Sequence, residues 1–173
     1  MIGRLQTVPV LDRVDLLATP VASAVQSLDG VHVAEIDPEL ADTAALVDAY
    51  GVPLEVSANC VLVAGRRGGE QRWAACVGLA TTRGDVNGVV RRRLDVRKVS
   101  FAAMPEAVDA TGMEYGGITP VGVPAGWPVL VDPAVVATDL VVLGSGVRKS
   151  KLVLPGSALL QLPGAEVLDG LGH

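Results

Sequence analysis

The chain has 173 residues, half of them hydrophobic, and a formal net charge of −5 at pH 7. This length fits a single domain with one substantial core, so we expect one domain over residues 1–173. The high hydrophobic content, with a mean hydropathy of +0.44, excludes a largely disordered chain. Aromatic residues make up only 3%, whereas Gly and Pro number 20 and 11, so we expect a core of aliphatic side chains and many turns.

The chain shows neither membrane segments nor cofactor motifs. Its apolar stretches fall short of the about 20 residues that a spanning helix requires, and the N-terminus lacks the features of a signal peptide. Cys60 and Cys76 lie in apolar segments, which favours buried free thiols over a disulfide or a redox role. No Cys and His spacing is typical of zinc, and no phosphate-binding loop is complete. We therefore expect a cytoplasmic protein without metal, cofactor or membrane contact.

The first half of the chain combines short helices, one alternating strand and a hairpin. Gly30 and Gly51 are placed to end helices, and Asp37-Pro38 is typical of a helix start. The predicted elements are helices at 11–17 and 21–28, a strand at 31–36, a helix at 39–50, hairpin strands at 60–64 and 72–81 around a turn at 66–70, a helix at 85–93, a brief strand at 99–102 and a helix at 105–111.

The second half is richer in strands. After a loop at 112–126 that is rich in Gly and Pro, strands are predicted at 129–131, 140–143 and 151–154. A turn or single helical turn at 133–138 and a last helix at 156–160 complete the set. Because strands outnumber long helices and hairpin connections recur, we predict an α/β (α+β) fold. Its mixed, largely antiparallel sheet is curled or forms a partial barrel, with surrounding helices.

Positive charge is concentrated in one segment. Residues 66–98 hold nine Arg and Lys against three acidic residues, a net of +6, which leaves −11 for the rest of the chain. Three of these residues, Arg91, Arg92 and Arg93, lie on one predicted helix. The asymmetry is compatible with a phosphate-binding face, although a solvated basic helix and hairpin is the simpler explanation.

The most unusual motif is the run Gly116-Gly117-Ile118-Thr119-Pro120. Two glycines permit close backbone approach, and the proline stiffens the exit from the loop. Such a loop can direct backbone N–H groups at a carbonyl oxygen and form an oxyanion hole, or it can be a tight turn that leads into a strand. A Ser-His-Asp or Cys-His arrangement is disfavoured, because the two histidines lie in a predicted strand and at the C-terminus.

This loop and the elements around it resemble the YbaK/prolyl-tRNA synthetase-associated family of aminoacyl-tRNA editing domains. Thr111-Gly112 and Gly116–Pro120 fit that family's TGx₃GGI[ST]P loop, and a strand ending at Asp132 follows. A second apolar strand then leads into Gly144-Ser145-Gly146 and Arg148. The resemblance is strongest over residues 20–170.

The resemblance implies a barrel-like mixed α/β domain that acts in trans as an aminoacyl-tRNA deacylase. It would hydrolyse the ester of a misacylated tRNA, often tRNA for proline carrying a small amino acid. The implied site residues are Gly116, Gly117 and Asn59 for catalysis, Ile118, Thr119, Pro120, Gly144, Ser145 and Gly146 for substrate binding, and Arg91, Arg92, Arg93 and Arg148 for tRNA binding. The implied partners are the tRNA and an aminoacyl-tRNA synthetase, and exposed strand edges also make a homodimer reasonable.

Three positions depart from the family pattern. Asn59 stands where the family commonly has a lysine, Met113 replaces an aromatic residue, and Lys151 replaces an acidic one. An inactive tRNA- or synthetase-binding module of the same fold is therefore the alternative function, and an unrelated ligand-binding or oligomer-forming domain is the third. Both the deacylase and the inactive binding module predict a pocket lined jointly by Asn59, Gly117 and Thr119.

Overall fold

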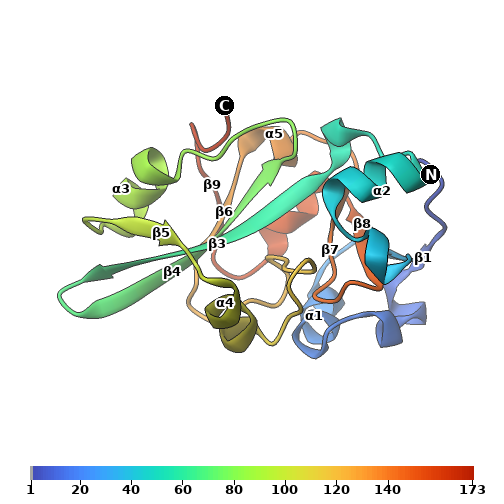
Figure 1. The fold of residues 1–173 in the computed structure, drawn as a ribbon, viewed down its shortest axis with the longest axis horizontal. Coiled ribbons are helices and arrows are strands. Elements are labelled where there is room, and N and C mark those ends of the chain that lie inside the picture. Colours follow the sequence, from blue (N-terminus) through green and yellow to red (C-terminus); the bar gives the residue numbers. More distant parts are fainter. Residues whose placement is uncertain (1) are drawn as a thin grey trace.

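The computed structural model describes residues 2–173 and contains two β-sheets with helices packed around them (Figure 1). In the first sheet all neighbours are antiparallel, and the strand order is β1 (Thr7–Pro9), β2 (His32–Glu35), β8 (Ser150–Leu154) and β7 (Val141–Gly144). In the second sheet the order is β5 (Val99–Phe101), β3 (Ala58–Arg67), β4 (Glu70–Leu79), β6 (Val129–Val131) and β9 (Ala165–Val167).

The predicted fold class is confirmed, with one refinement. Within the described residues the antiparallel pairings dominate, and the pairings of β4 with β6 and of β6 with β9 are parallel. The strands form two separate sheets rather than a closed barrel. A single bridge between Ser57 and Val142 brings the start of β3 next to β7, and the two sheets meet there.

Within residues 2–173, five α-helices surround the sheets, and most are short. They are α1 (Thr19–Ala24), α2 (Thr43–Tyr50), α3 (Arg91–Leu94), α4 (Met104–Thr111) and α5 (Pro133–Val136). The helices predicted at 11–17 and 156–160 are 3-10 turns instead, at Val10–Asp12, Val14–Leu16 and Gly156–Gln161. The first of these segments cannot continue as a helix because Arg13 adopts φ −141°, outside the helical region. None of the helices in residues 2–173 has the length and apolar character that crossing a bilayer requires.

The hairpin of β3 and β4 is confirmed, and its first strand is longer than predicted. Each strand has ten residues, and Arg67 pairs with Glu70 across a turn of only two residues. Gly68 and Gly69 have φ values of +57° and +82°, as the tight two-residue turns that suit twisted hairpins demand. The hairpin therefore carries its basic tip far from the other sheet (Figure 1).

The main core lies between the two sheets. It contains fully buried side chains from β2, β7 and β8 on one side and from β4 and β6 on the other, with Met113 and Val121 from the long loop. Smaller clusters form under α3 on the outer face of the second sheet and under α2 on that of the first. The low aromatic content is thus compensated by close packing of Val, Leu and Ala, as expected.

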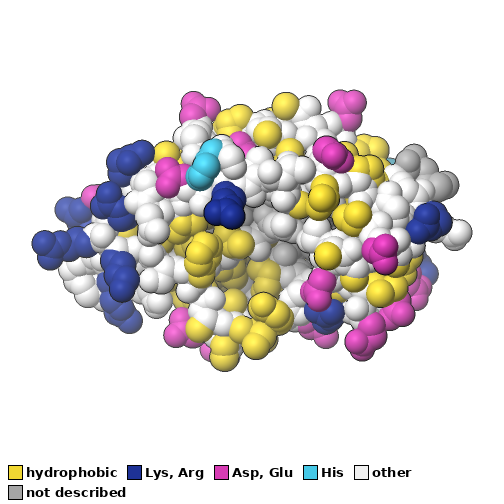
Figure 2. Space-filling view, turned by 45° about the horizontal axis from the view of Figure 1, so that its top comes forward, with side chains coloured by type: hydrophobic (Ala, Val, Ile, Leu, Met, Phe, Trp, Pro, Cys, Tyr) yellow, Lys and Arg dark blue, Asp and Glu magenta, His cyan; other side chains and the backbone are white. Residues whose placement is uncertain are grey.

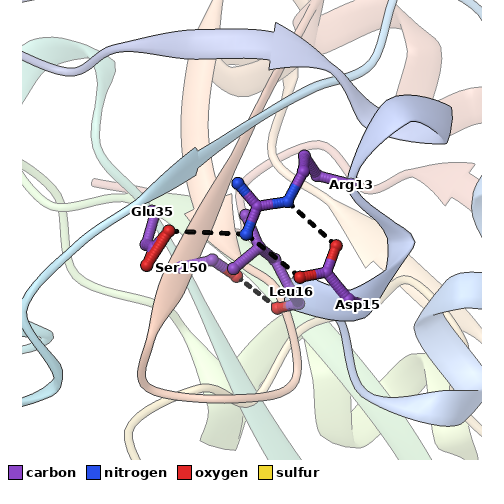
Figure 3. A network of polar contacts seen from close by, with 5 residues as sticks. All are labelled: Arg13, Asp15, Leu16, Glu35 and Ser150. Carbon is purple, nitrogen blue, oxygen red and sulfur yellow. Dashed lines mark hydrogen bonds and ion pairs between the residues drawn. The ribbon is translucent and has the colours of Figure 1, made fainter.

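The N-terminal segment is tied to the first sheet by polar contacts (Figure 3). The guanidinium of Arg13 donates to the carboxylate of Asp15 at 3.0 Å and lies 3.5 Å from that of Glu35 on β2. The buried hydroxyl of Ser150 at the start of β8 donates to the carbonyl oxygen of Leu16 at 2.6 Å. These contacts fix the start of β8, which lies beside the site described below.

The core packing makes a direct prediction for stability. Replacing Leu152, which is fully buried on β8, with Ala should lower the free energy of unfolding by about 2–5 kcal/mol, because a cavity would form between the sheets. The same truncation at Leu11, which is 62% exposed, should change it by less than about 0.5 kcal/mol. Denaturant unfolding of both variants tests this, and equal losses would contradict the proposed core.

Candidate active site

A cleft of about 430 Å³ opens beside the first half of β3. Its walls come from the start of α2, the end of β5, α4, and the loop that contains Gly116 and Ile118. Gly144 on β7 and Lys151 on β8, which are paired with each other, complete it. The cleft therefore lies where the two sheets meet, and a volume of this size is typical of small-molecule sites.

Two glycine-rich loops form one wall of the cleft by binding each other through the backbone. The N–H of Glu114 donates to the carbonyl of Gly146 at 2.8 Å, and the N–H of Gly146 donates to the carbonyl of Gly117 at 2.7 Å. The carboxylate of Glu114 also accepts the N–H of Arg148 at 2.7 Å. These bonds hold the loops in a single arrangement.

Only glycine fits at the points of closest approach. A Cβ atom at Gly117 would lie 2.7 Å from the backbone nitrogen of Val147, and one at Gly144 would lie 2.6 Å from the carbonyl oxygen of Ile118. Real Cβ atoms essentially never come closer than 3.0 Å to such atoms. The glycines of the sequence motif therefore serve the contact between the loops as well as the cleft.

The structure divides the predicted loop residues into two groups. Gly116, Ile118 and Gly144 line the cleft. Gly117 and Thr119 do not line it, contrary to expectation: the N–H of Gly117 is already bonded to the carbonyl of Glu114 at 2.9 Å, and Thr119 is fully buried. Of the two glycines, Gly116 is the one whose N–H has no hydrogen-bond acceptor within residues 2–173.

Three further predicted binding residues lie behind the wall of the cleft. Pro120 is buried, and Gly146 faces Ala18 and Val21. Ser145 is fully buried, and its hydroxyl lies within hydrogen-bonding distance of the carbonyl oxygens of Val147 and Ser150 and of the Ser150 hydroxyl. The predicted substrate contact of Ser145 is therefore not formed, because its hydroxyl stabilises the turn between β7 and β8.

Asn59 lies in the cleft, where the family resemblance places a site residue. It is exposed on β3, and its side-chain oxygen accepts a hydrogen bond from the hydroxyl of Thr43 at 3.1 Å. Thr43 is the first residue of α2 and also lines the cleft. Asn59 can thus orient a ligand through its amide but brings no charge.

Lys151 supplies the positive charge that Asn59 lacks. It lines the same cleft from β8, where the sequence showed only a departure from an acidic residue of the family pattern and predicted no role in the site. Its ammonium forms no hydrogen bond or ion pair with residues 2–173. Burial lowers the pKa of Lys151, the nearby carboxylate of Asp42 raises it, and the charge of Arg148 lowers it. A cation in an otherwise apolar strand was the signal in the sequence that marked this residue.

Arg148 serves the architecture of the cleft rather than the basic segment. Its Nε donates to the carbonyl of Pro38 at 3.1 Å, and its Nη1 lies 3.6 Å from the carboxylate of Asp42. It therefore joins the glycine-rich loops to the segment that precedes α2. Its guanidinium also packs against Gly116, where a Cβ atom would collide with it.

The thiol that lines the cleft is not poised for nucleophilic attack. Both cysteines are free, Cys60 half-buried in the cleft wall and Cys76 buried. Burial raises the pKa of the Cys60 thiol, with a smaller contribution from neighbouring Cys76, and burial raises the pKa of Cys76 to about 12. Since the thiolate is the reactive form, both side chains are expected to be inert.

The basic segment forms one end of the molecule, around the hairpin tip and α3 (Figure 2). Arg93 is engaged in an ion pair with Glu166, and Arg91 donates to the carbonyl of Asn87 at 2.9 Å, whereas Arg92 is exposed. Trp73 and Trp127 stack there, with ring centroids 4.7 Å apart, in a second groove of about 430 Å³. This end is separate from the cleft, and the three arginines line no part of the cleft.

A family model of the aminoacyl-tRNA editing domain matches residues 37–162, well over half of the chain. The chain belongs to the aminoacyl-tRNA editing domain family. The matched region includes the first half of β3, both glycine-rich loops and Lys151, and so contains every wall of the cleft. No curated protein matches the chain significantly.

Solved structures share the fold of this editing domain at low sequence identity. One, described as a candidate trans-editing enzyme for prolyl tRNA synthetase, has a TM-score of 0.75 and 22% identity, covering 90% of this chain and 96% of its own. Another, the hypothetical protein APE2540, has a TM-score of 0.77 and 20% identity, covering 89% of this chain and 99% of its own. At such identities the likeness establishes the architecture alone.

The environment of Lys151 makes a prediction about its titration. Its ammonium should lose its proton below the usual lysine range, because burial disfavours the charged form. Asp42→Asn should lower the pKa further, since a favourable charge is removed, and Arg148→Gln should raise it. NMR of methylated lysine side chains measures the three values, with Lys149→Arg and Lys98→Arg used to assign the signals. A pKa insensitive to both substitutions would contradict the charge arrangement of the cleft.

Proposed function

We propose that this editing domain is a trans-acting deacylase that hydrolyses the ester of a misacylated tRNA. The observation that carries the proposal is the ammonium of Lys151, which lies in the cleft beside the loop containing Gly116 and forms no hydrogen bond or ion pair within residues 2–173. A half-buried cation that forms no hydrogen bond or ion pair within the described residues is placed to meet a negative group of a ligand. The family membership gives the class of ligand.

The reaction requires little from the protein, since an aminoacyl ester is already activated. Water adds to the carbonyl carbon, the bond to the ribose oxygen breaks, and the products are the free amino acid and the ribose hydroxyl, which takes up a proton. In such a mechanism, most of the rate enhancement comes from holding the ester in one orientation and from stabilising the developing oxyanion. Among the described residues that line the cleft there is no histidine, and burial raises the pKa of the Cys60 thiol, which disfavours a thiolate nucleophile there.

In our proposal, three groups of the cleft stabilise the oxyanion and orient the substrate. The ammonium of Lys151 stabilises the carbonyl oxygen as it becomes negative, an interaction that is stronger in a partly desolvated cleft than in water. The free N–H of Gly116 is the second donor. The amide of Asn59, held by Thr43, binds a hydroxyl of the terminal adenosine. The cation that the family commonly carries at the Asn59 position is thus supplied from β8.

The lining of the cleft supports a small amino acid as the group that is removed. Small side chains from four separate parts of the chain form much of it: Ala41, Ala58, Ala102 and Ala107. Leu62 and Ile118 also line the cleft and add apolar surface. With a fold shared with a candidate editing enzyme for prolyl tRNA synthetase, we propose tRNA for proline carrying a small amino acid as the substrate.

The proposal extends to the setting in which the domain acts. We propose that the whole chain acts as one domain in the cytoplasm, where it receives misacylated tRNA with or without a synthetase as partner, and a homodimer is compatible with its exposed strand edges. The tRNA contacts are assigned to Arg92 at the basic end and to neighbouring basic residues. An inactive module that only binds tRNA or a synthetase is the competing function, favoured by the uncharged Asn59 and opposed by the charge of Lys151.

Single-turnover deacylation of a panel of aminoacyl-tRNAs tests the proposal. Alanyl- or cysteinyl-tRNA for proline should be hydrolysed, and correctly charged prolyl-tRNA should be spared. Lys151→Met should slow the chemical step on the order of 10²-fold, as loss of an oxyanion donor does, whereas the exposed Lys149→Met should match the parent protein.

The outcomes separate the two functions. If no member of the panel is hydrolysed while tRNA still binds in a salt-dependent manner, the protein is a binding module and the deacylase proposal is wrong. If Lys151→Met and Lys149→Met are equally active, hydrolysis does not depend on the cation of the cleft, and the assignment of Lys151 fails.

A further inference from the structure

Strand β5 connects the cleft to the basic end of the molecule. It is an edge strand, paired on one side with β3 through Val63, Ala64 and Gly65. Its last residue, Phe101, lines the cleft, and Arg97 and Lys98 immediately precede its first residue. At a rise of about 3.3 Å per residue, Phe101 and Lys98 lie about 10 Å apart along this edge. A ligand that leaves the cleft along β5 therefore passes from an aromatic ring to positive charges.

The aromatic side chains at this exit are unusually exposed. Phe101 is the single phenylalanine of the chain, and its exposed fraction is 65%. Tyr115, which also lines the cleft, is 61% exposed. In a protein with 3% aromatic residues, two exposed rings at the rim of one cleft indicate a surface that binds a partner with flat apolar faces.

The positive charges beside Phe101 are not neutralised by the protein. Within residues 2–173, Arg97 and Lys98 are exposed and form no ion pair, and Arg66, at the end of β3, forms none either. Other arginines of the same segment are paired, for example Arg67 with Asp95 at 2.5 Å. The unpaired charges thus follow β5 and the adjoining part of β3, and a polyanion would complement them.

We propose that this surface, formed by Phe101, Tyr115, Lys98, Arg97 and Arg66, binds the single-stranded 3′-terminal nucleotides of the RNA whose aminoacyl end lies in the cleft. The bases stack on Phe101 and Tyr115, and the phosphates of the following nucleotides pair with Lys98, Arg97 and Arg66. A single strand fits better than a duplex, because only unpaired bases can present their faces to exposed rings. The inference rests on the proposed function for the direction of the strand, with its 3′ end in the cleft.

Binding of a short single-stranded RNA ending in CCA, followed by fluorescence anisotropy, tests the inference without any requirement for catalysis. Phe101→Ala should weaken binding on the order of tenfold, as loss of one stacking ring does. Lys98→Ala should weaken it and reduce the slope of log K against log salt by about 0.7, since one phosphate contact is lost. Leu11→Ala and Lys149→Ala, of similar exposure elsewhere on the surface, should bind as the parent protein does.

A second substrate distinguishes failure of this inference from failure of the proposed function. The Lys98→Ala variant should lower kcat/KM for aminoacyl-tRNA but leave hydrolysis of an aminoacyl ester of adenosine alone unchanged, because that substrate carries no further nucleotides that could reach Lys98, which lies outside the cleft. If Phe101→Ala and Lys98→Ala both bind the RNA as the parent protein does, the inference is overturned, even if the protein proves to be a deacylase. A change in oligomeric state on Phe101→Ala, measured as the mass of the particle in solution, together with unchanged RNA binding would overturn it as well. That result would identify β5 as a contact between copies of the chain.

Discussion

The candidate active site depends on a backbone contact that only glycine permits. The loop from Glu114 to Ile118 and the turn between β7 and β8 approach so closely that a Cβ atom at Gly117 or Gly144 would overlap backbone atoms of the opposite loop. The resulting hydrogen bonds between Glu114, Gly146 and Gly117 place the inner edge of both loops on the cleft. Because β8 begins directly after this turn, the same contact determines where Lys151 lies.

This arrangement explains how an editing domain can keep a charged cleft without a lysine on β3. Asn59 and Lys151 belong to different sheets, yet both line the cleft, since the sheets meet at the start of β3. The position on β8 places the ammonium near Asp42 and Arg148, whose charges act on it in opposite directions. Lys151 therefore lies in a group of three charges, with Asp42 from directly before α2 and Arg148 from the turn before β8.

The sequence was sufficient for the fold class, the hairpin and the loop motif, because these depend on local patterns such as glycine pairs and apolar runs. It did not predict β1 and β9, which have three residues each and form through pairing with distant strands. It also placed Gly117, Thr119 and Ser145 in the pocket. A motif reveals which residues are unusual. Only the packing of the two loops shows that Gly117, Thr119 and Ser145 are buried behind the wall of the cleft and that Lys151 lines the cleft.

The most direct test of the account is to locate a non-hydrolysable ligand, an adenosine that carries alanine through a 3′-amide, by NMR chemical-shift perturbation of the backbone and lysine signals. The account predicts the largest changes at Gly116, Ile118 and Gly144 and at the side chain of Lys151, with none in the groove of Trp73 and Trp127. Changes confined to that tryptophan groove, with the signals of Lys151 unmoved, would contradict the assignment of the cleft as the active site.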